Sequence, residues 1–227
     1  MAHAPGMKRF YLALVAIAAV GGGWIWMSTK RAGAAPPAEP LSESAVAAAS
    51  SFPGYVLGSV SAPVEVTEFA DFQCPGCAQF AVLTMHDVKQ RLISAGRVRW
   101  RFKDFPLESH ANTRAAHHAA ACADEQGRFW EMHDQLFYNQ PRWSFERNPG
   151  RRFVEYARTI GLDLNRFEDC TRTGRYRARI EASVRDGQRL GVTSTPSFVV
   201  GSVRLPEPPS YDELKAIIDS LTPKPAR

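Results

Sequence analysis

The sequence predicts an α/β fold in which a βαβ unit and a ββα unit are separated by a helical insertion. Strand, helix and strand patterns follow one another within about 40 residues, between Pro63 and Lys103. Helical patterns then fill the segment from about residue 107 to 190. Two short apolar runs flank Gly201-Ser202, a two-residue spacer typical of a β-hairpin, and one more helical pattern follows them. This order of elements predicts one sheet shared by the two units.

The first unit contains two strands and the helix between them. Residues 63–72 alternate in polarity and predict a largely buried strand that carries one acid, Glu68. A helix with one apolar stripe runs from 75 to 96, and the strict alternation of apolar and basic residues at 98–103 predicts a half-buried strand. A βαβ arrangement of these segments places Cys74 at the first turn from strand to helix.

The insertion and the second unit are delimited by glycine and proline residues, which end helices and mark turns. The final helix closes the domain after the hairpin. We expect helices at 111–126, 129–140, 148–161 and 175–190, a short helix carrying Phe167 and Cys170, hairpin strands at 197–200 and 203–205, and a last helix at 211–221.

The N-terminal segment predicts export from the cytoplasm. Phe10–Met27 contains 18 residues without a charge and follows two basic residues, and this length is at the lower limit for spanning a bilayer. A cleavage site is conceivable at 32–34, but Lys30 and Arg31 lie before it and favour an uncleaved anchor in the inner membrane. Both alternatives carry the rest of the chain into the periplasm or another extracytoplasmic compartment, where oxidising conditions allow disulfides.

The chain divides into three parts by composition. Residues 1–31 are the signal anchor or signal peptide, and residues 32–53 are rich in alanine, proline and serine and predict a linker. A short helical piece is conceivable within this linker at 42–49. The folded domain takes residues 54–222. Hydrophobic and charged contents of 44% and 22% are typical of a globular protein rather than a disordered one.

Positive charge is concentrated in one part of the chain. The segment 142–189 contains twelve arginines, no lysine and seven acidic residues, so its excess of five positive charges equals the net charge of the whole chain. A solvated helical surface explains this pattern best. A surface that meets anionic lipid or acidic partners is the alternative. Aromatic residues are not interleaved with the arginines, so the pattern does not favour nucleic acid.

The four cysteines raise three alternatives: a metal clamp, a structural bridge or a redox pair. Cys74 and Cys77 form a single CxxC motif, whereas Cys122 and Cys170 are separated by 48 positions. A structural zinc site requires four ligands, and the six histidines include no His-x3-His or His-x4-His spacing. We therefore expect no metal, and we expect the histidines at the surface or partly buried.

The surroundings of Cys74 favour redox chemistry. Cys74 is expected at the N-cap of the helix and Pro75 at its first position, where the missing N–H has no helical partner in any case. First-turn N–H groups, including that of Cys77, can donate to the sulfur, and the helix N-terminus carries about half a positive charge. Both effects favour a thiolate and predict a lowered pKa for Cys74. Cys77 lies one turn inside, and Gly76 leaves both sulfurs uncovered.

A second motif directly precedes the hairpin. Thr195-Pro196 heads the strand at 197–200, a position where proline is unusual. A cis peptide bond there would expose the Thr195 backbone beside the dithiol, where a substrate peptide could pair with it. An ordinary trans turn proline is the alternative, and the nearby CxxC motif favours the cis bond.

Several motifs together resemble the thioredoxin superfamily, and within it the DsbA-type thiol–disulfide oxidoreductases, particularly their membrane-anchored bacterial relatives. They lie within about Val56 to Leu221 and comprise FADFQCPGC, ACADEQGRFWEMHDQLF, YARTIGLD and TPSFVVG. The resemblance implies a thioredoxin fold interrupted by a helical insertion. It also implies Cys74 as nucleophile, Cys77 as resolving thiol and Pro196 as part of the substrate site.

Two further positions are compared with the family pattern. Glu68 matches the family's buried acid, which would relay protons to or from Cys77. The alternative is that Glu68 is an ordinary acid on the exposed face of the strand. The strongly oxidising members carry histidine before the second cysteine, where this chain has Gly76. This departure predicts an oxidant of intermediate strength with unchanged chemistry.

The expected function is therefore extracytoplasmic thiol–disulfide oxidoreduction, with disulfides donated to reduced, translocated proteins. A membrane or soluble partner would reoxidise the enzyme, and no organic cofactor is expected because the dithiol is the redox group. A disulfide reductase or isomerase of the same fold is the alternative. A more remote alternative is a non-catalytic module that binds peptides or metal.

The remaining two cysteines are expected to form a structural disulfide across the insertion. Cys122 and Cys170 both lie on predicted helices, the compartment is oxidising, and the CxxC motif leaves them as the only partners for each other. Two buried free thiols are the alternative.

Overall fold

The computed structural model describes residues 39–40, 52–205 and 207–222, which all belong to one compact unit. Within these residues we find no helix with the length and apolar character needed to cross a membrane. The predicted anchor at 10–27 and the helical piece at 42–49 lie outside the described residues.

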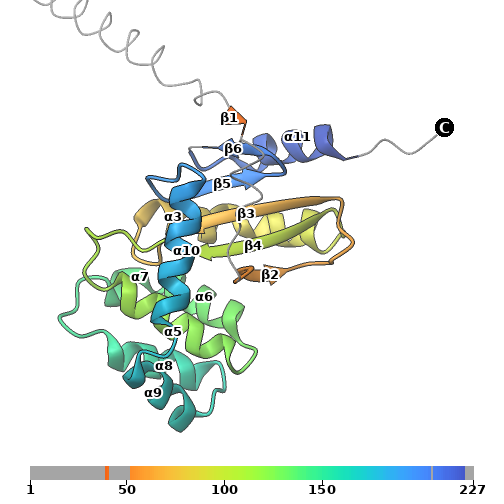
Figure 1. Ribbon diagram of the computed structural model, residues 1–227. Coiled ribbons are helices and arrows are strands. Elements are labelled where there is room, and N and C mark those ends of the chain that lie inside the picture. Colours follow the sequence, from red (N-terminus) through yellow and green to blue (C-terminus); the bar gives the residue numbers. More distant parts are fainter. Residues whose placement is uncertain (1–38, 41–51, 206, 223–227) are drawn as a thin grey trace, which may run out of the picture. The chain divides into compact units, whose positions relative to one another are not determined.

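The described strands form one mixed sheet in the order β1-β6-β5-β3-β4-β2 (Figure 1). The central strands β3 and β4 are parallel, whereas every other pair is antiparallel. This order confirms the predicted α/β fold, because strand, helix and strand are followed after the insertion by a hairpin that pairs with the first strand. The strands are β1 (Glu39–Pro40), β2 (Tyr55–Leu57), β3 (Val64–Ala70), β4 (Val98–Asp104), β5 (Ser197–Val200) and β6 (Val203–Leu205).

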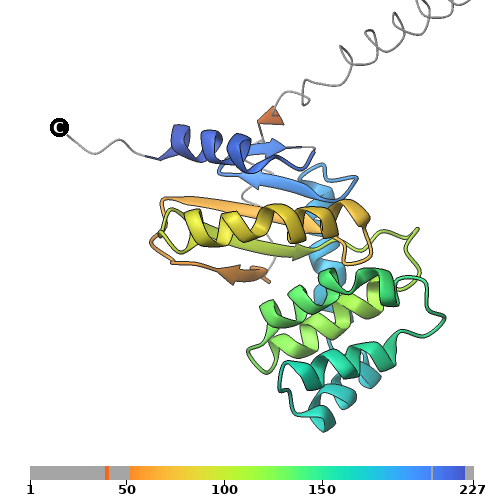
Figure 2. The same cartoon turned by 180° about the vertical axis from the view of Figure 1, so that it is seen from behind.

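Helices cover both faces of the sheet. The helix after β3 and the C-terminal helix α11 (Tyr211–Leu221) lie on one face, and α10 (Arg177–Arg189) lies on the other (Figures 1 and 2). Trp100 is fully buried on the first face together with Leu214 of α11. On the second face α10 approaches closely at Gly187, where an added Cβ would lie 2.6 Å from the Phe105 ring.

The helix that begins at Pro75 is not uniformly α-helical, which corrects the expectation of one regular helix from 75 to 96. It consists of α3 (Pro75–Gln79), the π-helical segment η1 (Phe80–Thr84), α4 (Met85–Val88) and the π-helical segment η2 (Lys89–Ile93). Gly96 follows with a φ of +69°, a left-handed conformation that suits glycine at a helix end.

The insertion between β4 and β5 is entirely helical, as predicted, and its helices pack beside the sheet in both views (Figures 1 and 2). Its core is rich in alanine and aromatic side chains and continues to Cys74 and Cys77. Before α10 its helices are α5 (Thr113–Asp124), α6 (Phe129–Tyr138), α7 (Gln140–Trp143), α8 (Gly150–Thr159) and α9 (Leu164–Thr173).

Two expectations about the insertion were wrong in detail. α6 ends at Tyr138, and Pro141 lies in the first turn of the short helix α7, so proline here begins a new helix and does not end the previous one. His117 and His133 are 0% and 1% exposed, although we expected histidines at the surface or partly buried. His117 is paired with the fully buried Asp104, Nδ1 to Oδ1 2.6 Å, which satisfies part of its hydrogen-bonding capacity.

Two strands were not predicted. Tyr55–Leu57 forms β2 and pairs with β4, at the start of the expected folded domain. Glu39–Pro40 forms β1 and pairs with β6, within the segment expected to be a linker. Both strands are too short to show an alternating pattern of their own, so only pairing with a partner strand defines them.

Candidate active site

The CxxC motif lies at the carboxyl end of β3, where the chain turns into α3. Cys74 is the N-cap residue and Pro75 begins the helix, which is the arrangement the sequence predicts. Both cysteines are free thiols. Cys74 is 7% exposed and Cys77 is 0% exposed, so only the first sulfur has any access to solvent.

The environment of the Cys74 sulfur favours the thiolate. Its pKa is lowered to about 6, first by a hydrogen bond from the Cys77 thiol and further by the Thr195 side chain and the N–H groups of Cys77 and Gly76, against the effect of burial. The thiol itself donates to the carbonyl oxygen of Thr195, Sγ to O 3.3 Å. The sulfur accepts no hydrogen bond of ordinary geometry from the first turn, so those N–H groups act on it electrostatically.

Cys77 has the opposite character. Burial raises its pKa well above the ordinary value, and the neighbouring Cys74 sulfur and Glu68 add to this effect. The backbone N–H of Asp71 donates to the Cys77 sulfur at 3.4 Å and partly offsets the shift. The two sulfurs of the motif therefore differ in acidity, and the Cys74 sulfur is the more acidic one.

Glu68 is a buried acid on β3, not a surface residue, with 2% of its surface exposed. Burial raises its pKa to about 7, while a hydrogen bond from Trp100 and the charge of Lys89 act in the other direction. The indole Nε1 of Trp100 lies 3.1 Å from Oε2. Among the described residues Oε1 has no partner. A carboxyl group with this pKa is able to take up and release protons near neutral pH.

Pro196 and Gly76 face each other beside the Cys74 sulfur. The Thr195–Pro196 peptide bond is cis. A Cβ added at Gly76 would lie 3.4 Å from Cδ of Pro196 and 3.8 Å from the Cys74 sulfur. Any side chain at position 76 would therefore begin in contact with both the sulfur and the Thr195-Pro196 segment.

Asp71 holds the turn before the motif, a role that the sequence analysis did not assign to it. The side chain is completely buried. Its carboxylate accepts hydrogen bonds from the N–H groups of Gln73 at 2.7 Å and Leu107 at 2.8 Å, and from the hydroxyl of Thr113. Nδ1 of His110 lies 2.7 Å from Oδ2. One carboxylate thus connects the active-site turn to the start of the insertion.

The short helix α7 also fixes this turn. Nε2 of Gln140 donates to the carbonyl oxygens of Phe72 at 2.7 Å and Cys74 at 3.0 Å. Nε2 of Gln73 donates to the carbonyl oxygen of Ser144 at 2.8 Å. The backbone of Cys74 is therefore held by a side chain 66 positions away along the chain, which no local sequence pattern could have indicated.

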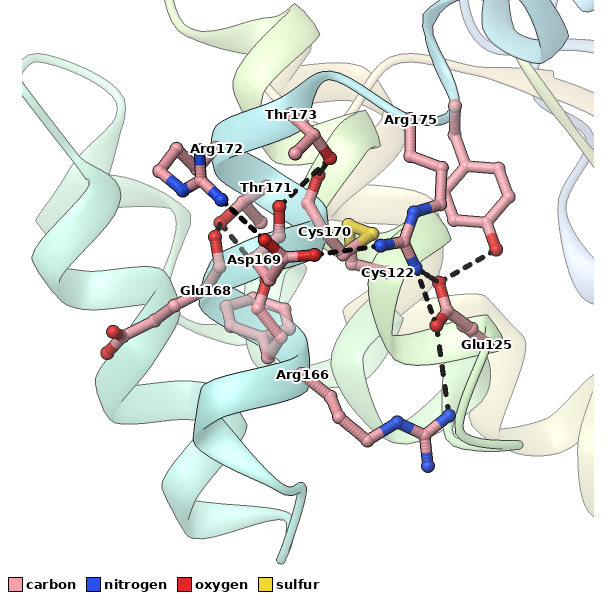
Figure 3. A network of polar contacts seen from close by, with 12 residues as sticks. Cys122, Glu125, Arg166, Glu168, Asp169, Cys170, Thr171, Arg172, Thr173 and Arg175 are labelled. Atoms are coloured by element: carbon pink, nitrogen blue, oxygen red, sulfur yellow. Dashed lines mark hydrogen bonds and ion pairs between the residues drawn. A yellow bond between two sulfur atoms is a disulfide. The ribbon is translucent and has the colours of Figure 1, made fainter.

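The second cysteine pair lies inside the insertion, away from the motif. Cys122 on α5 and Cys170 on α9 are joined by a disulfide with a Cα–Cα distance of 5.8 Å. Arg175 forms ion pairs with Glu125, 2.7 Å, and Asp169, 2.9 Å, and so adds a polar connection between the same helices (Figure 3). Many arginines of the basic segment are paired in this way, which favours a solvated, ion-paired helical surface.

One cluster of potential metal ligands is present in the described part of the chain. It consists of His118, Cys122 and Cys170, whose candidate ligand atoms lie within 4.8 Å of one another. Because the two sulfurs are bonded to each other, neither is a thiolate, and the cluster offers a zinc ion only the nitrogen of His118.

Comparisons with known proteins agree with this geometry. A family model described as Thioredoxin matches residues 50–220. The Na(+)/H(+) antiporter NhaA 3 of Salinispora tropica is 35% identical over 167 residues, which make up 73% of this chain and 24% of that protein. This chain thus spans about a quarter of the length of the antiporter relatives that it matches.

Two further comparisons cover most of both chains. The probable disulfide bond formation protein D of Bacillus anthracis is 27% identical over 167 residues, 72% of this chain and 76% of that protein. The crystal structure of oxidised BdbD from Bacillus subtilis aligns with a TM-score of 0.68 at 24% identity, and covers 81% of this chain and 96% of that one. The similarity to the BdbD structure shows the fold of this chain, including the inserted helical domain.

Proposed function

The chain belongs to the thioredoxin family and is a DsbA-like thiol–disulfide oxidoreductase, and on this premise we propose that Cys74 and Cys77 are its redox pair. The observation that carries the proposal is the difference between the two sulfurs. The accessible sulfur has its pKa lowered to about 6, and the buried one has its pKa raised. This is the asymmetry that a nucleophile and a resolving thiol require.

In the proposed reaction the protein donates its disulfide to a substrate. A substrate thiolate attacks the Cys74 sulfur, the Cys74–Cys77 bond breaks, and Cys77 leaves as a thiolate while a mixed disulfide forms. A second substrate thiolate then attacks the substrate sulfur of the mixed disulfide, and Cys74 leaves as a thiolate. The substrate loses two electrons and gains a disulfide, and the protein retains both electrons as its dithiol.

Glu68 is proposed to supply the proton that the Cys77 thiolate takes up. Because the pKa of Cys77 is raised, its thiolate is a strong base once the active-site disulfide opens. The pKa of Glu68 at about 7 leaves a large fraction of its carboxyl group protonated at neutral pH. The Thr195 backbone is proposed to pair with the substrate chain, since its carbonyl already contacts the Cys74 thiol.

The direction of electron flow follows from thiolate stabilisation. Groups that stabilise the Cys74 thiolate stabilise the reduced form and make the protein an oxidant. The strongly oxidising members have a histidine where this chain has Gly76, so the stabilisation of the thiolate by an imidazole is missing here. An ionised Glu68 near Cys77 would also destabilise the reduced form. We therefore expect a potential between those of thioredoxin and DsbA, about −270 mV and about −120 mV.

The proposed partners and place follow the same argument. Substrates are reduced or misoxidised proteins outside the cytoplasm, and a membrane or soluble redox partner restores the disulfide. The apolar segment 10–27 would hold the enzyme at the inner membrane.

Equilibration with glutathione buffers, followed by thiol quantification, tests the direction. A potential at or below that of thioredoxin would favour a reductase. Oxidation of dithiothreitol and reduction of insulin, each compared with Cys74→Ala, separate an oxidoreductase from a non-catalytic module. A wild type as inactive as Cys74→Ala in both assays would overturn the proposed function.

A further inference from the structure

Phe145 is the most exposed large apolar side chain among the described residues, at 93%. Phenylalanine placed for packing would bury most of its roughly 200 Å² of surface, and this one buries almost none. It follows Ser144, whose own side chain is buried. The ring therefore contributes little to the stability of the fold and is available to another molecule.

The turn that carries Phe145 is held firmly. Nδ2 of Asn112 donates to three carbonyl oxygens around it, those of Trp143 at 3.3 Å, Ser144 at 3.0 Å and Glu146 at 2.8 Å. The two N–H groups of this amide are shared among the three carbonyls and fix the backbone on both sides of the exposed ring. A preorganised side chain loses less conformational entropy on binding than a side chain on a mobile loop.

The same turn is connected to the nucleophile. Nε2 of Gln73 donates to the Ser144 carbonyl at 2.8 Å, and the Asn112 N–H donates to Oε1 of Gln73 at 2.7 Å. Gln73 directly precedes Cys74, so the turn and the nucleophile belong to one hydrogen-bonded unit. A polypeptide joined covalently to the Cys74 sulfur therefore lies within reach of the Phe145 ring.

The charges near this ring select among polypeptides. Residues 142–152 contain four arginines and one glutamate, and Glu146 is paired with Arg152 at 2.9 Å. Arg142 and Arg147 are exposed, and within the described part of the chain neither forms an ion pair. Positive charge beside an apolar ring favours a segment that combines apolar and acidic side chains.

We propose that Phe145 is a specificity-determining contact of this active site, and that it receives an apolar side chain of an acidic polypeptide segment joined to Cys74 in the mixed disulfide. The inference rests on the proposed function and extends it to the insertion side of the motif. The apolar contact lowers the free energy of the mixed-disulfide transition state for substrates that carry such a side chain near the cysteine. Small thiols, which cannot reach the ring, gain nothing from it.

The test compares two peptides that contain one cysteine and two glutamates and differ only in a leucine or alanine two residues from the cysteine. Stopped-flow measurement gives their rates of attack on the oxidised wild type, Phe145→Ala and the control Val60→Ala. Val60 is 81% exposed and precedes β3, at the end of that strand remote from Cys74, so its truncation removes a smaller exposed apolar surface far from the active site.

We expect the wild type and Val60→Ala to react roughly tenfold faster with the leucine peptide, and Phe145→Ala to lose this preference. Phe145→Leu should retain part of it. All variants should oxidise dithiothreitol at the same rate, which reports an intact active site. If Phe145→Ala keeps the leucine preference, this inference is overturned and the proposed function stands. The same holds if Phe145→Ala changes the oligomeric state but not the rates with the two peptides. Failure of the wild type to oxidise dithiothreitol would overturn the proposed function and, with it, this inference.

Discussion

The two cysteine pairs of this chain are almost equally buried but differ in every other respect. Cys74 and Cys77 are 7% and 0% exposed, and Cys122 and Cys170 are 1% exposed each. The first pair consists of free thiols three positions apart at a helix N-terminus, and the second is a disulfide between residues 48 positions apart. Burial therefore does not determine what a cysteine pair does.

Chain separation and local electrostatics account for the difference. A bridge across 48 positions removes many conformations from the unfolded chain, whereas a bridge within CxxC removes few. A hydrogen bond from the Cys77 thiol, together with the N–H groups of the first turn, lowers the pKa of Cys74, whereas burial, together with the Cys74 sulfur and Glu68, raises the pKa of Cys77. Around the second pair the charged groups are ion-paired with each other at the surface (Figure 3). The first pair is thus suited to exchange and the second to stabilisation.

The largest expected effect is on catalysis. Cys74→Ala removes the attacked sulfur, so we expect the rate of dithiothreitol oxidation to fall by at least about a thousandfold. The matched change, Cys122→Ala with Cys170→Ala, removes the other pair and should leave the rate within about twofold below the unfolding temperature. A large loss of rate in the second variant, measured where it remains folded, would contradict the division of roles.

The second effect is on stability. In the chain-entropy model, loss of the Cys122–Cys170 bridge lowers the free energy of unfolding by at most about 4 kcal/mol. Urea unfolding of the double alanine variant measures it, with Cys74→Ala as the control that keeps the bridge. Thiol counting after denaturation of a Cys74 and Cys77 double variant checks the pairing directly: two free thiols would show that the bridge does not form.

The third effect is a pH dependence of stability. The folded pKa of Glu68, about 7, is raised above its ordinary value of 4.5, so the folded state holds a proton that the unfolded state releases. The associated stability is complete below pH 4.5 and is lost as pH rises through 7, by about 3 kcal/mol in total.

Cys74 acts in the opposite direction, because its lowered pKa adds stability to the reduced protein as pH rises from about 6 to 9. The Glu68 effect is therefore measured by urea unfolding in a Cys74→Ala background. Adding Glu68→Gln to that background should remove this loss of stability between pH 4.5 and 7, whereas His118 and His133, whose pKa values are lowered by burial, contribute equally in both proteins. Equal slopes with and without Glu68 would show that its carboxyl titrates normally.

The smallest expected effect concerns the residue between the cysteines. A histidine at position 76 begins 3.8 Å from the Cys74 sulfur and places an imidazolium near the thiolate. Gly76→His should raise the reduction potential by about 30 mV or more, which corresponds to a tenfold shift in the redox equilibrium. Gly76→Ala fills the same initial space without a charge and serves as the control. An equal shift in both variants would assign the change to packing rather than to the imidazole.

The sequence by itself determined those features whose signals are local. Alternation over 98–103 predicts β4, the spacer Gly201-Ser202 predicts the hairpin of β5 and β6, and Cys-Pro at the start of a helical pattern predicts the N-cap position of Cys74. Each of these patterns depends on neighbours within about one turn or one strand, so it can be read without knowledge of the fold.

Only the tertiary structure decided the features that depend on distant partners. β2 exists because it pairs with β4, and Gln140 and Asn112 hold the active-site turn across long separations along the chain. Glu68 owes its raised pKa to burial, and Asp71 has four hydrogen-bond partners from the turn and the insertion. Hydrogen-bond partners and desolvation are set by which segments meet in space, and that information is not local in a sequence.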